Sequence, residues 1–274
     1  MLCDMWKLGI ALLLTACAAK GMAPDVTPLT QAAGLQRVEV TAEPFVLTAF
    51  VRNTNPNASV HVYVEGDGYA YVTKTTPSGN PTPHRPVALE LALQDLHPNM
   101  IYLARPCQYT PVANNPACAD RKWWTTHRFD AVSLAALNEA VDKLKQNASQ
   151  HIELIGFSGG ATMALLLAAQ RHDVISVRTV AGNLSPAVVN HVHGVSSMPN
   201  ALDPRNVASK LQRIPQHHWV GANDKVITPA VAETYHAALP IPHCSAWQVV
   251  PAASHTEGWH NWAEGLSQPL PCKD

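Results

Sequence analysis

The stretch Gly156-Phe157-Ser158-Gly159-Gly160 has the residue types and spacing best suited to covalent chemistry in this 274-residue chain. A strand-like apolar run, residues 151–157, leads into it, and a helix-like run follows directly. A serine on such a sharp turn is strained, and the flanking glycines avoid collisions with neighbouring strands. The turn also lies at the positive end of a helix, where the amide of Gly159 can donate to an oxyanion. We therefore predict that Ser158 is a nucleophile; an ordinary turn is the alternative.

A nucleophilic serine needs a histidine to accept its proton and an acid to orient that histidine. After a turn of this kind the expected chain order is serine, acid, histidine, with each residue following a strand. Asp224 follows the strand-like residues 217–223, and His255 follows the strand-like residues 247–254. We predict these two residues as the partners of Ser158. Asp224 could instead be a turn residue or helix cap, and Asp203 is a competing acid that follows no clear strand.

A second oxyanion donor is expected after an earlier strand. Residues 60–64 alternate in the manner of a strand and end on Glu65-Gly66-Asp67-Gly68. The two glycines allow a backbone to approach a ligand closely. We expect the amide of Asp67 or of Gly68 to donate, and an ordinary β-turn is the alternative.

The composition excludes several other kinds of site. The chain has a net charge of -1 with 14% charged residues and no basic block, so we predict no nucleic-acid partner. No Cys/His cluster has zinc-binding spacing. Four of the 14 histidines occur as near neighbours, but no carboxylate is spaced to complete a metal site with them. We therefore predict no metal, and expect solvated or packed side chains at His191, His193, His217 and His218.

The N-terminus indicates export. Residues 8–16 form an apolar run that is too short to span a bilayer, and Leu14-Thr15-Ala16-Cys17 resembles the lipobox of bacterial lipoprotein signal peptides. This resemblance implies a signal peptide at 1–16, lipidation of Cys17 and a lipid anchor in the cell envelope. Ala18 is typical of lipoproteins of the outer membrane, with the domain facing the periplasm or the cell surface. A plain secretory signal is the alternative.

Four cysteines remain once Cys3 has left with the signal and Cys17 has been acylated. They can form three different sets of two disulfides. Pairing of sequence neighbours would close one short loop and hold the C-terminus, and each bridge would add about 2–4 kcal/mol in an oxidising compartment. The four are Cys107, Cys118, Cys244 and Cys272.

The order of the remaining elements predicts one α/β domain over residues 37–274, after a flexible tether at 17–36. Apolar residues make up 47% of the chain, which suits one substantial core. Strands alternating with helices, after an initial antiparallel portion, predict a mostly parallel sheet covered on both faces. We expect strands at 35–52 (broken at Glu43-Pro44), 59–64, 100–106, 151–157, 174–182, 216–224 and 246–252, and helices at 88–96, 129–148, 159–172, 229–239 and 257–266.

Two segments could shape a substrate pocket. Residues 183–213 have weak periodicity and lie where a small cap could be inserted. The excursion between the first two of the four cysteines is followed by Trp123 and Trp124, which either wall the pocket or belong to the core.

Over residues 37–270 the chain resembles the α/β-hydrolase superfamily, through the motifs EGDG, GFSGG, GANDKVITP and SHTEGW. That superfamily often has histidine where Glu65 stands, which leaves the exact oxyanion donor open. The resemblance implies acyl transfer to water through an acyl-enzyme, without cofactor or metal, on a small-molecule ester or acyl substrate. Ser158 would attack, His255 would carry the proton and Asp224 would hold the imidazole. A peptidase or amidase with the same three residues, and a non-catalytic binding lipoprotein on the same scaffold, are the alternatives.

Overall fold

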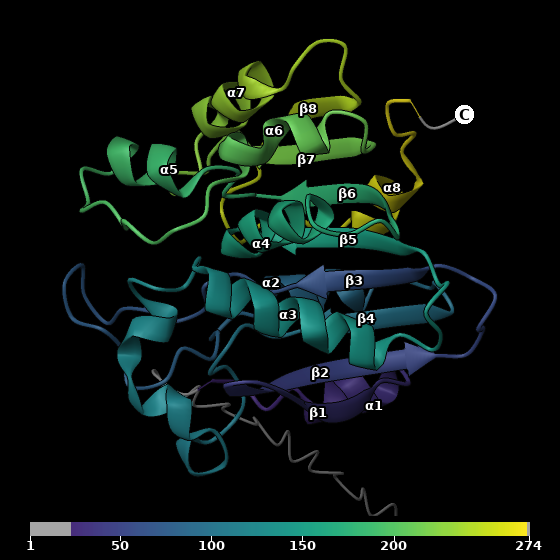
Figure 1. Ribbon diagram of the computed structural model, residues 1–274, viewed down its shortest axis with the longest axis vertical. Coiled ribbons are helices and arrows are strands. Elements are labelled where there is room, and N and C mark those ends of the chain that lie inside the picture. Colours follow the sequence, from purple (N-terminus) through teal and green to yellow (C-terminus); the bar gives the residue numbers. More distant parts are fainter. Residues whose placement is uncertain (1–22, 273–274) are drawn as a thin grey trace, which may run out of the picture.

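A computed structural model describes residues 23–272 and contains one eight-stranded sheet in the order β1-β2-β4-β3-β5-β6-β7-β8 (Figure 1). β1 pairs with β2 and β2 with β4 in antiparallel fashion, and all other neighbours are parallel. The predicted fold class, a mostly parallel sheet after an antiparallel start, is confirmed. The strands are β1 (Gln36–Ala42), β2 (Phe45–Asn53), β3 (Val60–Val64), β4 (Asn99–Leu103), β5 (Ile152–Phe157), β6 (Val174–Val180), β7 (Gln216–Gly221) and β8 (Ser245–Val250).

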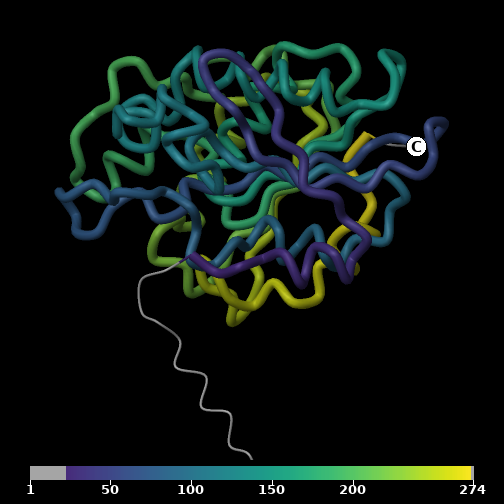
Figure 2. Tube along the Cα trace, turned by 90° about the horizontal axis from the view of Figure 1, so that it is seen from below, coloured from purple at the N-terminus to yellow at the C-terminus, as the bar shows by residue number. Residues whose placement is uncertain are grey.

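Helices cover both faces of this sheet. In Figure 2 the teal helices lie on one side of the strands, and the helices at residues 27–32 (purple), 87–92 (blue) and 262–267 (yellow) lie on the other. The helices are α1 (Thr27–Ala32), α2 (Val87–Ala92), α3 (Ala131–Leu144), α4 (Gly159–Ala168), α5 (Pro186–Val192), α6 (Ala208–Leu211), α7 (Pro229–Ala238) and α8 (Trp262–Ser267), with 3-10 turns η1 (Val112–Asn114), η2 (Pro116–Ala119), η3 (Arg121–Trp124) and η4 (Pro204–Val207).

The sheet separates two hydrophobic clusters because successive side chains of a strand point to opposite faces. On β3, Val62 and Val64 belong to the cluster under α3 and α4, whereas Tyr63 belongs to the cluster under α2 and α8. On β5, Leu154 and Ile155 divide in the same way. Both strands are therefore buried on two sides, which is why their sequences read as nearly continuous apolar runs.

The N-terminal end of the domain differs from the expected tether. Residues 27–32 form helix α1, and Val26 and Leu35 are buried in the cluster that also contains α2 and α8. Small and proline-containing sequence suggested a flexible segment, but these two apolar side chains hold it against the sheet. The folded domain thus includes residues assigned to the tether. The break expected at Glu43-Pro44 is the turn between β1 and β2.

The four cysteines pair as sequence neighbours, Cys107 with Cys118 and Cys244 with Cys272. The proposed signal peptide and Cys17 lie outside the described residues. Within residues 23–272, no helix is both long and apolar enough to cross a membrane.

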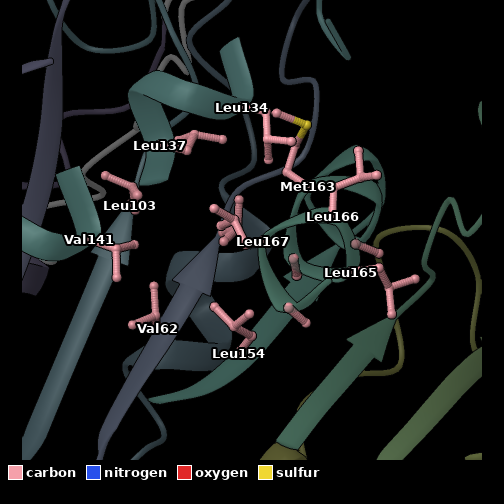
Figure 3. Packing of buried hydrophobic residues seen from close by; sticks show 14 of the residues in the cluster. Val62, Leu103, Leu134, Leu137, Val141, Leu154, Met163, Leu165, Leu166 and Leu167 are labelled. Atoms are coloured by element: carbon pink, nitrogen blue, oxygen red, sulfur yellow. The ribbon is translucent and has the colours of Figure 1, made fainter. Parts of the chain in front are cut away.

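The core around α4 gives a direct test of this packing. Figure 3 shows Leu167 of α4 among side chains of α3 and the strands, and Leu167 is fully buried. Leu167→Ala should lower the free energy of unfolding by about 2–5 kcal/mol, because it leaves a cavity that the neighbours fill only in part. Leu96 is 92% exposed, so Leu96→Ala should change it by less than about 0.5 kcal/mol. Urea denaturation measures both, and equal effects would contradict the packing described.

Candidate active site

Ser158 lies on the turn between β5 and α4, as the sequence predicted. Its backbone has φ 49° and ψ −122°, a conformation that residues with a side chain rarely adopt. A Cβ on Gly156 would approach the Cα of Ala161 to 2.5 Å, and one on Gly160 would approach the carbonyl oxygen of Glu65 to 2.6 Å. The glycines therefore let the turn fit between β5, α4 and the end of β3.

The three residues predicted to act together are joined by hydrogen bonds. His255 Nε2 lies 3.0 Å from Ser158 Oγ, and His255 Nδ1 lies 2.9 Å from Asp224 Oδ2. An ionised carboxylate only accepts hydrogen bonds, so Nδ1 carries the imidazole proton and Nε2 is free to accept the proton of the serine. The structure thus brings together residues from the ends of β5, β7 and β8.

Asp224 is held by its own loop. Its side chain is completely buried, and Oδ1 accepts hydrogen bonds from the amides of Val226 at 2.7 Å and Ile227 at 2.8 Å. These two bonds leave Oδ2 facing His255. The preceding amide of Asn223 donates to the carbonyl of Ala253 at 2.8 Å, which ties this loop to the one that carries His255.

The loop Glu65-Gly66-Asp67-Gly68 lies against the serine. A Cβ on Gly66 would lie 3.2 Å from Cβ of Ser158, so this backbone passes close to the Ser158 side chain. The amide of Gly66 donates to Glu65 Oε1 at 2.8 Å and is thereby occupied. Within residues 23–272 the amides of Asp67 and Gly68 have no hydrogen-bond acceptor. Gly159, as the first residue of α4, likewise has no intrahelical acceptor for its amide.

Glu65 is a buried carboxyl that sequence reasoning did not single out as a titrating group. Its Oε2 accepts from the Tyr102 hydroxyl at 3.0 Å, and Oε1 faces the amide of Ala88 at the start of α2 at 3.5 Å. Burial raises the pKa of Glu65 to about 7, although its hydrogen-bond donors act in the opposite direction. The position beside two glycines was the available signal, but the burial that shifts the pKa depends on α2 and β4.

A hollow of about 380 Å³ opens over Ser158 and His255, and its other lining residues include Tyr69, His84 and Val226. We call it the Ser158 hollow. It lies at the carboxyl ends of the parallel strands, the left-hand edge of the sheet in Figure 1. Parallel α/β sheets usually bind their ligands at this edge.

Residues 183–213, where a small cap could be inserted, fold as α5, η4 and α6, and none of them lines the Ser158 hollow. His193 Nε2 donates to the carbonyl of Val226 at 2.7 Å, which joins the end of α5 to the Asp224 loop. A separate hollow of about 460 Å³ lies between α5 and Asp203 and contains neither Ser158 nor His255. Trp123 and Trp124 do not line the Ser158 hollow; Trp124 is buried and Trp123 packs edge-on against Phe45.

The other candidate residues have structural partners. Asp203, the competing acid, accepts from the Ser185 hydroxyl at 2.6 Å and from the amide of Arg205 at 3.0 Å. His218 is buried beside the Thr179 hydroxyl at 2.9 Å, and burial lowers its pKa to about 3. Among residues 23–272, no group of three or more His, Cys, Asp or Glu side chains is placed to hold a metal ion.

Comparison with solved structures identifies the fold. Est1E from Butyrivibrio proteoclasticus has a TM-score of 0.58 at 10% identity, over 84% of this chain and 95% of that chain. A Pyrococcus furiosus esterase, Pf2001, has a TM-score of 0.60 at 14% identity, over 89% and 91%. The acylaminoacyl peptidase of Pyrococcus horikoshii has a TM-score of 0.60 at 10% identity, over 88% and 42%. With this sheet order, these matches define an α/β-hydrolase fold.

The family is shown by a sequence match. The model of the family described as serine hydrolase (FSH1) matches residues 83–247, more than half of the chain. The chain therefore belongs to the FSH1 serine hydrolase family. The matched segment contains Ser158 and Asp224 and ends before His255. A comparison with curated proteins found no match.

Glu65 makes the stability of the fold depend on pH. Its pKa of about 7 exceeds the ordinary value of 4.5, so the stability it contributes is present below pH 4.5 and is lost as the pH rises through 7. Glu65→Gln keeps the shape without the charge. Between pH 5 and 8 the variant should gain about 2–3 kcal/mol in free energy of unfolding relative to the parent protein.

Urea denaturation at several pH values measures this difference. Glu233→Gln, on the exposed face of α7, is the matched control and should follow the parent protein at every pH. A difference between the Glu65 variant and the parent that does not change with pH would contradict the raised pKa.

Proposed function

We propose that this serine hydrolase cleaves carboxylic esters through an acyl-enzyme formed on Ser158. The observation that carries the proposal is the continuous hydrogen-bonded series from Ser158 through His255 to Asp224. The Pyrococcus furiosus protein named above is an esterase, which agrees with this substrate class. The open hollow of about 380 Å³ gives a small acyl substrate access to the serine.

Acylation follows from the positions of these groups. Ser158 Oγ attacks the ester carbonyl carbon while His255 Nε2 takes the hydroxyl proton, and the buried Asp224 carboxylate stabilises the imidazolium that forms. The carbonyl oxygen becomes an oxyanion, which the amide of Gly159 and one amide of the Glu65–Gly68 loop can bind. The carbon–oxygen bond to the alcohol then breaks, and His255 returns the proton to the leaving alkoxide.

Deacylation repeats these steps with water. His255 Nε2 takes a proton from a water molecule, whose oxygen attacks the acyl carbon and restores the oxyanion. The bond to Ser158 Oγ breaks, the serine regains its proton from His255, and a carboxylic acid leaves. The protons and electron pairs balance without a cofactor in this sequence of steps.

The same residues could cleave an amide if His255 protonated a leaving amine. The structural similarity to an acylaminoacyl peptidase is the observation that favours amide cleavage as a second candidate activity. Parallel assays with p-nitrophenyl esters and the matching p-nitroanilides distinguish the two. We expect turnover of the esters, and faster turnover of the anilides would favour the amidase.

The nucleophile can be tested directly. A fluorophosphonate probe should label the parent domain and fail to label Ser158→Ala, because among the serines of residues 23–272 only Ser158 has a histidine nitrogen within hydrogen-bond distance of its hydroxyl. Asp224→Asn should remain folded and lose on the order of 10³–10⁴-fold in kcat, because the imidazole is no longer held in the required tautomer. Ser196→Ala, at an exposed serine, is the matched control. Labelling of Ser158→Ala would contradict the proposal.

We also propose that the enzyme is anchored in the cell envelope by lipid on Cys17. The sequence of residues 1–17 supports this location, and the two disulfides of the described domain suit an oxidising compartment. Several acyl chains hold a protein on a bilayer firmly, whereas a single chain holds it only weakly.

Expression of the full chain in a Gram-negative host tests the anchor. The parent protein should incorporate radiolabelled palmitate and sediment with the outer membrane. Cys17→Ala should incorporate none and should not be retained by lipid, whereas Cys3→Ala should behave as the parent does. A parent protein that is soluble in the periplasm would indicate the plain secretory signal instead.

A further inference from the structure

Resting on this proposed function, we propose that the Asp67 carboxylate, fixed by Arg105 and Arg128, is a positioning group for the oxyanion site. It would hold the amide of Asp67 beside the amide of Gly159, so that both can bind the oxyanion.

The first observation is where the Asp67 side chain lies. A Cβ on Gly159 would collide with the Asp67 carboxylate, so the carboxylate occupies the space directly over the residue that follows the nucleophile. Gly66 lies against Ser158 in the same way. The loop therefore contacts Ser158 through Gly66 and Gly159 through the Asp67 side chain. The amide of Asp67 belongs to the peptide bond that joins these two contacting residues, and it has no hydrogen-bond acceptor within residues 23–272.

The second observation is that two arginines form ion pairs with the Asp67 carboxylate. Arg105 Nη1 lies 3.4 Å from Asp67 Oδ1, and Arg128 Nε lies 2.9 Å from Oδ2. The side chains are 5%, 17% and 24% exposed for Arg105, Arg128 and Asp67, so solvent screens these pairs less than it screens surface pairs. Burial lowers the pKa of Arg105 to about 10, which leaves its guanidinium charged at neutral pH.

The two arginines are themselves immobilised. Arg105 donates to the carbonyl of Arg128 and lies 5.3 Å from the ring centroid of Phe129. Arg128 Nη1 donates to the carbonyl of Thr125 at 2.7 Å. Guanidinium groups held in this way present a fixed site to the carboxylate instead of following its motion.

A third attachment comes from the disulfide-bonded excursion. Gln108, next to Cys107, donates through Nε2 to the carbonyl of Gly66 at 3.0 Å, and its Oε1 accepts from the amide of Arg105 at 3.1 Å. The loop is thus held at Gly66 and at Asp67 by residues 105–128. None of residues 105–128 lines the Ser158 hollow, whereas Asp67 and Gly68 of the loop do.

A carboxylate beside an oxyanion site repels the negative charge of the transition state. The two possible roles of Asp67 therefore predict opposite changes in kcat when its charge is removed. Alone, the charge of Asp67 would oppose the negative charge that develops on the substrate. If its only influence were this repulsion, Asp67→Asn would raise kcat. If its main role is to fix the amide of Asp67, loss of the ion pairs with Arg105 and Arg128 lets the Glu65–Gly68 loop move, and kcat falls.

The experiment compares Asp67→Asn with the parent enzyme on a p-nitrophenyl ester. We expect kcat to fall by roughly 10- to 100-fold, less than the loss of a whole oxyanion donor can cause, with KM changed by less than about threefold. Inhibition by a trifluoromethyl ketone, whose adduct carries an oxyanion, should weaken by a similar factor. Rates are expressed per serine that fluorophosphonate labels at completion, so unfolded protein does not contribute.

Asp173→Asn is the matched control. Asp173 is 21% exposed and also pairs with two cations, Arg171 at 2.7 Å and Lys145, but it precedes β6 at the opposite edge of the sheet. Its substitution should lower thermal stability and leave kcat unchanged. Equal kcat losses in the two variants would mean that Asp67 acts only through stability and would overturn the proposal.

A double-mutant cycle tests the contact itself and does not depend on the Asn variant. Gly159→Ala should lower kcat strongly when Asp67 is present, because the new methyl group displaces the carboxylate. It should lower kcat much less in the Asp67→Ala background, where the space is free. Additive effects would show that the contact has no influence on the reaction.

The outcomes separate the two levels of inference. A parent protein that neither binds fluorophosphonate nor turns over esters would overturn the proposed function. An active parent protein with an unchanged or raised kcat in Asp67→Asn would overturn only the role of the Asp67 carboxylate.

Discussion

Three backbone segments converge on Ser158 with no space for side chains between them, and the site depends on this close approach. The end of β3, the turn after β5 and the start of α4 meet at Gly66, Gly156 and Gly160, where an added Cβ would crowd its neighbours. The backbone of Ser158 has a positive φ, and the close packing of the three segments around it holds this strained conformation in place. The same convergence places Ser158 against the Glu65–Gly68 loop and at the start of α4.

Much of this arrangement could be predicted from the sequence because parallel strands end at a common edge. Ser158, Asp224 and His255 each follow a strand-like run, and residues in that position meet whatever the intervening helices are. The strands themselves were recognisable because burial on both faces demands apolar residues throughout. Apolar residues at helical spacing predicted α3, which occupies 131–144 within the expected 129–148.

The groups around the Glu65–Gly68 loop could not be predicted in this way. Arg105, Gln108 and Arg128 belong to a segment of short 3-10 turns with no regular periodicity, and their contacts exist only because that segment packs against the loop that follows β3. Helix α1 was missed for a related reason. Val26 and Leu35 are isolated apolar residues in polar sequence, and they become anchors only when the sheet provides a surface.

The carboxyl groups of the site differ in how their charge is compensated. Asp224 is matched by two amides and His255, and Asp67 by two guanidinium groups, whereas Glu65 receives hydrogen bonds from the neutral donors Gly66 and Tyr102. Burial therefore raises the pKa of Glu65 to about 7, and near neutral pH a large fraction of it is uncharged. While Glu65 is protonated, its carboxyl adds no negative charge beside the oxyanion position that we propose. In that proposal the amides of Gly159 and Asp67 then act on the developing charge with less electrostatic opposition.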